Sequence, residues 1–232
     1  MRRFLAVLMV VLPQRLKHLI ARRLLGWELH PTARIGRSLV MARHVRMGPE
    51  SFIGAFNVIK DIENLHLGRG ANIATRNWIV GVPLESAIYD KPQRDPSLYL
   101  GEYAMITVGH DIDCADKVEL KDHAVIAGFR SSVLTHSLNL VNDKFVTGPV
   151  VLEEYGVLMS NCTMMTGTRV PAGSVISARS VVNTRLTAER TFYRGNPAEA
   201  VRELPETLKF YQREGRQQQL ADEVARWLSA AD

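Results

Sequence analysis

The chain has 232 residues, of which 46% are hydrophobic and 23% are charged, as is ordinary for a folded globular protein. These values exclude a disordered chain and a collagen, and the presence of only two cysteines excludes a disulfide-rich secreted domain and favours a reducing compartment. The net charge of +5 lies entirely in residues 1–28, which contain six basic residues and a single acidic one. Because the remaining residues balance in charge, we do not expect the chain to bind nucleic acid.

Residues 1–28 are predicted to form a basic amphipathic helical segment. The apolar run from Phe4 to Leu12 is followed by Pro13 and is far shorter than the roughly 20 residues that a bilayer-spanning helix needs. After Pro13, aliphatic residues recur on one helical face, with basic residues beside them and one, Arg23, on that face. We expect this segment to lie on an anionic membrane surface, or to cap the main domain or pack between subunits. The aliphatic residues are Leu16, Leu19, Ile20 and Leu24.

From residue 29 onward, an aliphatic residue recurs at every sixth position. The first unbroken series is Leu29, Ile35, Met41, Met47, Ile53, Ile59 and Leu65. The series continues after two-residue shifts at Leu67 and Leu120 and after interruptions at Leu100 and Leu152, and it ends at Val182. A period of six fits neither a helix nor a simple strand. It predicts an all-β solenoid, a parallel β-helix of about seven coils with three short sides each.

The repeat also predicts the organisation of the chain, with the β-helix over residues 29–203. Residues 80–99 and residues 135–149 interrupt the repeat. Long loops on a rigid scaffold commonly carry binding and catalytic residues, so we expect function at these two insertions. Residues 204–232 leave the repeat, and we expect them to form a C-terminal helical cap.

The segments LGEYAM, LKDHAVIAG and VPAGSVISARSVV, followed by YRGNPAEAVREL, resemble the hexapeptide-repeat acyltransferases. The resemblance covers residues 29–203 and implies a left-handed parallel β-helix that assembles as a homotrimer with active sites between neighbouring subunits. Within this family the chain is most similar to sugar and polysaccharide O-acetyltransferases. The resemblance therefore implies acetyl-CoA as acyl donor and a carbohydrate as acceptor.

A general base for this transfer is expected among the seven histidines, because an imidazole that titrates near neutral pH suits the removal of a hydroxyl proton. His136 opens the second insertion directly after a well-formed coil, a placement that resembles that of the family's catalytic histidines. His110 is the alternative, as base, acceptor-binding group or orienting partner. Asp111 and Asp113 are acidic candidates for orienting an imidazole. No metal is expected, because the histidine spacings do not match those of the metal-binding carbonic anhydrases of similar fold.

The same resemblance places the acyl donor along the last coils of the β-helix. Small residues there let the pantetheine arm approach the backbone, and an arginine can meet a phosphate. The family positions that contact the donor fall on Ser160, Ala178, Asn183, Thr184 and Arg202. Three places depart from the family pattern: Met159 stands for a glycine, Glu199 for a basic residue, and Asn183 with Thr184 for a Thr-Lys pair.

These observations predict an acyl-CoA-dependent O-acyltransferase that modifies a sugar of a surface polysaccharide or its precursor. We expect it in the cytoplasm, in peripheral contact with a membrane through residues 1–28. N-acylation of an amino sugar is a close variant that the sequence does not separate from O-acylation. The alternative is a non-catalytic trimeric β-helix scaffold at the membrane.

Overall fold

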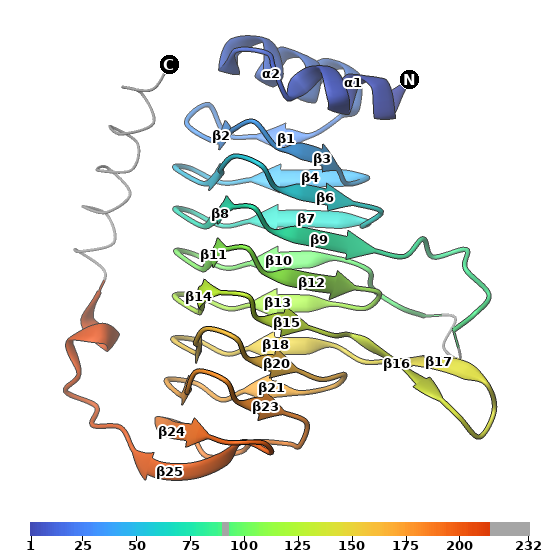
Figure 1. Cartoon of the computed structure of the whole chain (residues 1–232). Coiled ribbons are helices and arrows are strands. Elements are labelled where there is room, and N and C mark those ends of the chain that lie inside the picture. Colours follow the sequence, from blue (N-terminus) through green and yellow to red (C-terminus); the bar gives the residue numbers. More distant parts are fainter. Residues whose placement is uncertain (90–92, 214–232) are drawn as a thin grey trace.

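The computed structural model describes residues 1–89 and 93–213, which form a column of stacked coils with helices at one end (Figure 1). Each coil has three strands, and corresponding strands of successive coils pair in parallel to form three sheets. Such sheets, stacked in register, are typical of a left-handed β-helix, so the predicted fold class is confirmed. The first and third sheets have seven strands each, which gives seven coils.

Every coil passes through the three sheets in the same order. The first sheet contains β1 (Glu28–Leu29), β4 (His44–Met47), β7 (Asn64–Leu67), β10 (Leu98–Leu100), β13 (Val118–Leu120), β18 (Val150–Leu152) and β21 (Arg169–Val170). The second contains β2 (Arg34–Ile35), β5 (Phe52–Ile53), β8 (Asn72–Thr75), β11 (Met105–Val108), β14 (Val125–Phe129), β19 (Val157–Leu158), β22 (Val175–Ile176), β24 (Thr191–Arg194) and β25 (Glu199–Glu203). The third contains β3 (Leu39–Met41), β6 (Val58–Lys60), β9 (Trp78–Gly81), β12 (Asp111–Cys114), β15 (Ser132–Val133), β20 (Thr163–Met164) and β23 (Val181–Val182).

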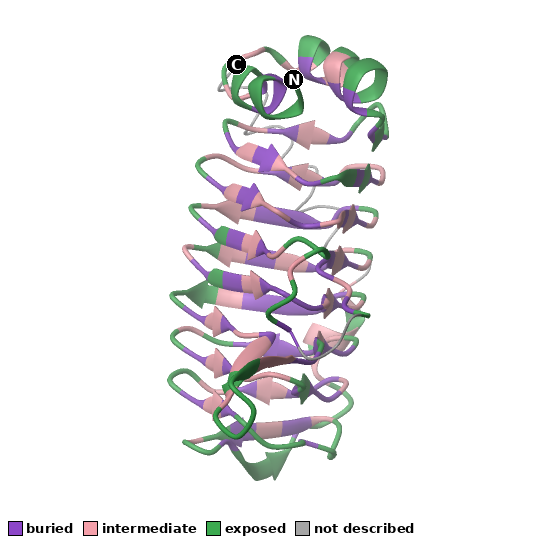
Figure 2. Cartoon of the chain, turned by 90° about the vertical axis from the view of Figure 1, so that its right-hand side faces the viewer, coloured by how far each residue is buried: buried purple, intermediate pink, exposed green. Residues whose placement is uncertain are grey.

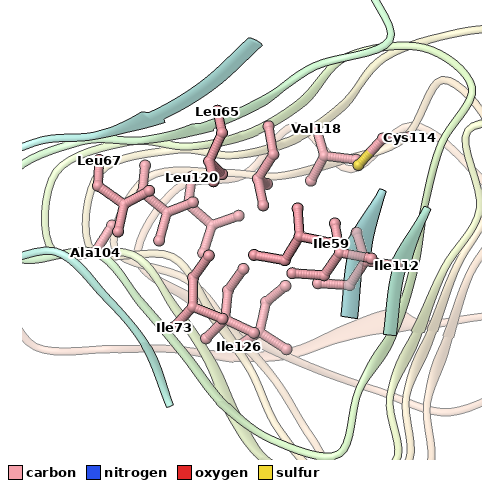
Figure 3. Packing of buried hydrophobic residues seen from close by; sticks show 14 of the residues in the cluster. Ile59, Leu65, Leu67, Ile73, Ala104, Ile112, Cys114, Val118, Leu120 and Ile126 are labelled. Atoms are coloured by element: carbon pink, nitrogen blue, oxygen red, sulfur yellow. The ribbon is translucent and has the colours of Figure 1, made fainter. Parts of the chain in front are cut away.

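Aliphatic side chains fill the axis of the column (Figure 3). In the second sheet, Ile53, Ile73 and Ile106 follow one another in register, and none of them is more than 1% exposed. Burying one such side chain fully contributes roughly 1.5–3 kcal/mol. The six-residue repeat therefore marks the residues that hold the coils together.

The column departs from a strict six-residue spacing at three kinds of place, one of which is β14, where a register shift puts Val133 seven residues after Ile126. In the first coil Val40, not Met41, faces the axis, because Val40 pairs in register with Ile59 and is only 3% exposed, so the prediction for Met41 is wrong. The two-residue shifts arise in the first sheet, where a strand turns two side chains inward, as Leu65 and Leu67 do in β7. Residues two apart on a strand share a face. A first-sheet strand can therefore be two residues longer and still keep all its aliphatic side chains directed toward the axis.

Helices and a hairpin close the two ends of the column. The helices α1 (Arg2–Met9) and α2 (Gln14–Ile20) and the π-helix η1 (Ala21–Leu25) lie over the first coil (Figure 1). At the other end β24 and β25 pair in antiparallel fashion, and the short 3-10 helix η2 (Lys209–Gln212) follows. The greater part of the predicted C-terminal cap, residues 214–232, falls outside the described residues.

Both predicted insertions leave the column at the corner between the third and the first sheet. Residues 82–97 connect β9 with β10, and the second insertion contains the antiparallel pair β16 (His136–Asn139) and β17 (Lys144–Thr147). Figure 2 looks onto the side of the column from which both insertions project. The two insertions touch, because the backbone N–H of Phe145 donates to the carbonyl of Ile88 at 3.1 Å and Tyr89 forms a β-bridge with Phe145.

Candidate active site

His136 is the first residue of β16 in the second insertion, directly outside the fifth coil. Val133 in β15 is the last axis-facing residue of that coil, and Thr135 is fully buried at the corner that follows. In the hairpin, His136 pairs with Thr147 as the chain returns to the column. The coil and the hairpin therefore fix the histidine from both sides, while 33% of its side chain is exposed.

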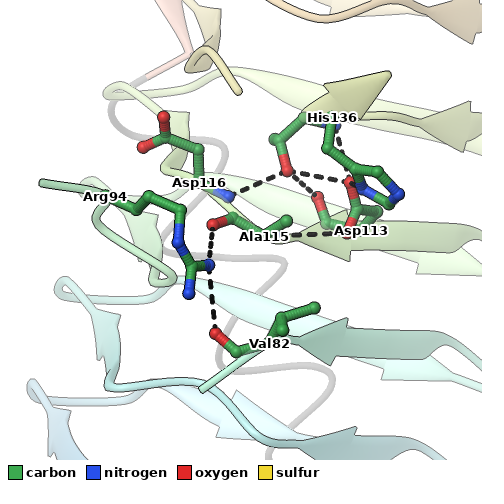
Figure 4. Close-up of polar contacts among 7 residues, drawn as sticks. Val82, Arg94, Asp113, Ala115, Asp116 and His136 are labelled. Atoms are coloured by element: carbon green, nitrogen blue, oxygen red, sulfur yellow. Dashed lines mark hydrogen bonds and ion pairs between the residues drawn. The ribbon is translucent and has the colours of Figure 1, made fainter. Parts of the chain in front are cut away.

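Asp113 in β12, on the preceding coil, is the partner of His136 (Figure 4). Its Oδ2 lies 2.7 Å from Nδ1 of His136 and also accepts from the backbone N–H and the hydroxyl of Thr135, at 2.8 and 2.9 Å. Its Oδ1 accepts from the backbone N–H of Ala115 at 3.1 Å. A carboxylate only accepts hydrogen bonds, so Nδ1 of His136 carries a proton and donates it. In the neutral ring Nε2 is then an acceptor, as a general base requires.

The pairing shifts the pKa of both groups. Burial raises the pKa of Asp113, but the hydrogen bonds from His136 and Thr135 outweigh burial, and the pKa ends below its ordinary value. The hydrogen bond to Asp113 raises the pKa of His136, against the opposing effect of burial. Asp113 is therefore ionised at neutral pH and stabilises a proton on the His136 ring. This arrangement resembles the carboxylate–imidazole pair of hydrolases and acyltransferases in which histidine takes a proton during nucleophilic attack.

Two aromatic rings contact the histidine, and an arginine lies against one of them. Tyr89 and Phe145 meet the His136 ring edge-on, with ring centroids at 6.0 and 5.3 Å. The guanidinium of Arg94 lies 4.1 Å from the centre of the Tyr89 ring. This guanidinium is buried and donates to the carbonyl oxygens of Val82, Pro83 and Ala115 at 3.2, 2.5 and 2.8 Å. Arg94 thus fastens the first insertion to the coil that carries Asp113 (Figure 4).

The structure places His110 inside the column wall, away from the pair of His136 and Asp113. Its side chain is fully buried, Nδ1 accepts from the backbone N–H of Ser131 at 3.1 Å, and Nε2 lies 3.0 Å from the hydroxyl of Thr107. Burial lowers its pKa to about 4. His110 belongs to a ladder in which each backbone N–H donates to the side chain one coil earlier. The ladder runs through Ser38, Asn57, Asn77, His110, Ser131 and Cys162.

The five predicted donor-binding residues occupy three different places. Asn183 and Thr184 are exposed and follow β23, two coils beyond β15 at the corner that also carries His136. Ser160 and Ala178 lie at the corner between the second and third sheets, where the carbonyl of Ser160 accepts from the backbone N–H of Arg179 at 3.0 Å. Arg202 is exposed on β25, with its guanidinium 5.5 Å from the centre of the Phe192 ring. Of the five residues, only Asn183 and Thr184 therefore lie at the same corner of the column as His136.

Sequence reasoning noted Asp113 only as one of two acidic candidates and missed Tyr89, Arg94, Thr135 and Phe145. The six-residue spacing alone did not identify Asp113 as the partner of His136, because Val133 lies seven residues after Ile126. In the structure, Ile112 and Val133 occupy equivalent axis positions in adjacent coils and pair in register, so the residues that follow them are neighbours. The residues of the insertions follow no repeat, and their positions could not be obtained in this way.

Within residues 1–89 and 93–213, no group of three or more His, Cys, Asp or Glu side chains is arranged to hold a metal ion. In the same part of the chain, no helix combines the length and apolar character needed to cross a membrane.

Solved structures of hexapeptide-repeat acyltransferases are similar to this chain. Acetyltransferase VCA0836 from Vibrio cholerae, complexed with acetyl coenzyme A, is 18% identical, with 88% of each chain covered and a TM-score of 0.44. The polySia-specific acetyltransferase NeuO is 16% identical, with 85% of this chain and 91% of that chain covered and a TM-score of 0.43. A mutant of AntD, an N-acyltransferase from Bacillus cereus in complex with dTDP-4-amino-4,6-dideoxyglucose and coenzyme A, is 14% identical, with 88% and 96% covered and a TM-score of 0.42.

No protein-family model and no curated protein sequence matches the chain. These three structures have identities below 20% and TM-scores below 0.5. The fold of the chain therefore follows from its own strand pairing.

Proposed function

We propose that this protein is an acyl-CoA-dependent acyltransferase that moves an acetyl group to a hydroxyl of a carbohydrate. The observation that carries the proposal is the pairing of His136 with Asp113 at 2.7 Å, beside two insertions that leave the same corner of the column. The carboxylate holds Nδ1, so Nε2 is the nitrogen available to a substrate. His136 is the proposed general base, and His110 is proposed to have a structural role only.

The proposed chemistry needs one proton acceptor from the protein. A sugar hydroxyl loses its proton only as it attacks, and a positioned base contributes roughly 10²–10⁴-fold to the rate of such a step. Nε2 of His136 takes this proton, and Asp113 stabilises the imidazolium that forms. An amine acceptor would use the same base, so N-acylation of an amino sugar remains the close variant of this proposal.

When bound, acetyl-CoA supplies the acyl group as an activated thioester. The residues of the last coils fit such a donor in charge and size. Asn183 and Thr184 are exposed at the corner of His136, and Arg202 offers a cation that suits a phosphate. Ser160 and Ala178 are small enough to allow an extended chain to approach the backbone. We propose these five residues as the donor contacts, and a homotrimer as the assembly that the sequence resemblance implies.

The first test is calorimetric titration of the folded protein with acetyl-CoA. We expect the protein to bind acetyl-CoA and Arg202→Ala to weaken this binding. Arg69 is an exposed arginine on an early coil, and Arg69→Ala should leave the affinity for acetyl-CoA unchanged. His136→Gln should bind acetyl-CoA as tightly as the wild type but lose transfer, followed as free thiol released in the presence of simple hexoses and amino sugars. A folded protein that does not bind acetyl-CoA would contradict the proposal and favour the scaffold alternative. Transfer that survives His136→Gln would contradict the assignment of the base.

A further inference from the structure

The helix α2 has its polar side turned toward the protein. The first coil has no preceding coil, so the carbonyl groups along its free edge need other donors. Gln14, Lys17 and His18 supply them from α2, and Lys17 is only 2% exposed. The bonds are Gln14 Nε2 to Ile35 O at 2.6 Å, Lys17 Nζ to Ile35 O at 2.8 Å and to Gly36 O at 2.7 Å, and His18 Nε2 to Ala33 O at 2.8 Å.

As a consequence, Leu16 and Leu19 of α2 face away from the protein, whereas Ile20 packs against the core and α1 turns Leu5 and Met9 toward the column. Leu16, Leu19 and Leu24 are 44%, 56% and 57% exposed, and Phe4 and Val11 are 70% and 76% exposed. Single exposed apolar residues are normal on a protein surface. Here they are concentrated, because eight of the nineteen large exposed hydrophobic residues of the described chain lie within residues 1–24. We call this surface of α1, α2 and η1 the leucine face.

Four exposed arginines accompany the leucine face. Arg15, Arg22 and Arg23 are exposed on α2 and η1, and Arg3 is exposed on α1. In the part of the chain that the structure describes, none of the four guanidinium groups has an ion pair or a hydrogen bond to a side chain. Four exposed arginines therefore lie in the same short segment as the exposed apolar side chains of the leucine face.

We propose that the leucine face binds the surface of an anionic membrane, with the aliphatic and aromatic side chains between the lipids and the arginines at the headgroups. An amphipathic helix that carries basic residues beside its apolar side has this mode of binding. Arginine is suited to it because the aliphatic stem can lie among the acyl chains while the guanidinium reaches the lipid phosphates. Contact with a second copy of the same face is less favourable, because it would bring Arg15, Arg22 and Arg23 of two chains together.

The position of the helices determines how the protein would stand on the membrane. The leucine face covers the end of the column, so the axis of the β-helix points away from the lipid (Figure 1). His136 follows the fifth coil, and successive coils are spaced by about 4.8 Å. The proposed base would then lie about 20 Å beyond the first coil, outside the bilayer.

The test is sedimentation of the full-length protein with phosphatidylcholine vesicles that contain or lack phosphatidylserine. We expect binding to the phosphatidylserine vesicles that weakens at high salt. Each arginine at an anionic surface contributes on the order of fivefold in affinity, so Arg15→Gln/Arg22→Gln/Arg23→Gln should weaken binding on the order of 100-fold. Leu16→Gln/Leu19→Gln should also weaken it. The matched control is Leu140→Gln/Val141→Gln, which removes apolar side chains that are 85% and 96% exposed at the hairpin tip.

Circular dichroism of each variant establishes that the column is folded. Equal binding by the wild type and Leu16→Gln/Leu19→Gln would overturn the proposal, as would a folded wild type that does not bind. It would also be overturned if the leucine changes dissociated an oligomer in the absence of vesicles, because the face would then be a contact between copies. The measurement uses neither acyl donor nor acceptor, so its outcome is independent of the proposed catalytic activity.

Discussion

His110 provides a quantitative test that separates a structural histidine from a catalytic one. Burial lowers its pKa from 6.5 to about 4. Because the folded pKa is depressed, the unfolded chain binds the proton more readily, and stability is lost as the pH falls from 6.5 toward 4. One pKa unit corresponds to about 1.4 kcal/mol, so the whole interval amounts to roughly 3 kcal/mol. Linkage places about 2 kcal/mol of this loss between pH 7 and pH 5.

The variant that removes this titration is His110→Asn, because Asn57 and Asn77 occupy the same ladder position in earlier coils. The shorter side chain lowers the free energy of unfolding by a similar amount at every pH, so the pH-dependent part is diagnostic. Urea unfolding at pH 7 and pH 5 should show the wild type losing about 2 kcal/mol more than His110→Asn. If the free energy of unfolding fell equally in the two proteins between pH 7 and pH 5, the assignment of His110 as a buried neutral member of the ladder would be refuted. At pH 7 the folded variant should keep its transfer activity, unlike His136→Gln.

Three further predictions concern the site and the column. Asp113→Asn should lower kcat on the order of 100-fold. It should also move the acid limb of the pH profile to lower pH, because the carboxylate raises the pKa of His136. Asp111→Asn, on the same face of β12, is the control that should change neither kcat nor the pH profile. Arg94→Met should lower stability by about 1–3 kcal/mol and expose residues 82–89 to limited proteolysis before global unfolding, since the carbonyls of Val82, Pro83 and Ala115 lose their donor. Ile106→Ala should lower the free energy of unfolding by about 2–5 kcal/mol in urea, and a loss well under 1 kcal/mol would contradict a tightly packed axis.

The column could be predicted because its physical requirement repeats. Each side of each coil needs an apolar side chain toward the axis, and that requirement recurs along the chain from Leu29 to Val182. The ladder position of His110 carried a similar signal, because the residue before each third-sheet strand is polar or small, as Asn57, Asn77 and Ser131 are. A comparison of the residues that precede the strands of the third sheet would have assigned His110 a structural position in the β-helix and not a catalytic one.

The partners of His136 were harder to obtain from the sequence. Asp113 precedes His136 by 23 residues. The number of residues in a coil varies, because strands such as β7 turn two side chains inward, so this separation does not by itself indicate that the two residues are neighbours. Counting along the chain therefore does not give the register, and only the pairing of Ile112 with Val133 does. Tyr89 and Arg94 come from an insertion with no repeat. Their positions depend on tertiary contacts such as the donation from Arg94 to the carbonyl of Ala115.

The order of the coils explains why a base can be built at this corner. The third coil carries the first insertion, the fifth carries the second, and the fourth, between them, turns the same corner through Ala115 to Lys117 without an insertion. Asp113 lies on this uninterrupted coil, where the backbone N–H groups of Ala115 and Thr135 hold its carboxylate in place. A carboxylate held by backbone donors keeps its direction even when neighbouring loops move. The rigid coil therefore carries the carboxylate that orients the imidazole, and the insertions on either side carry His136, the proposed base, and the rings of Tyr89 and Phe145.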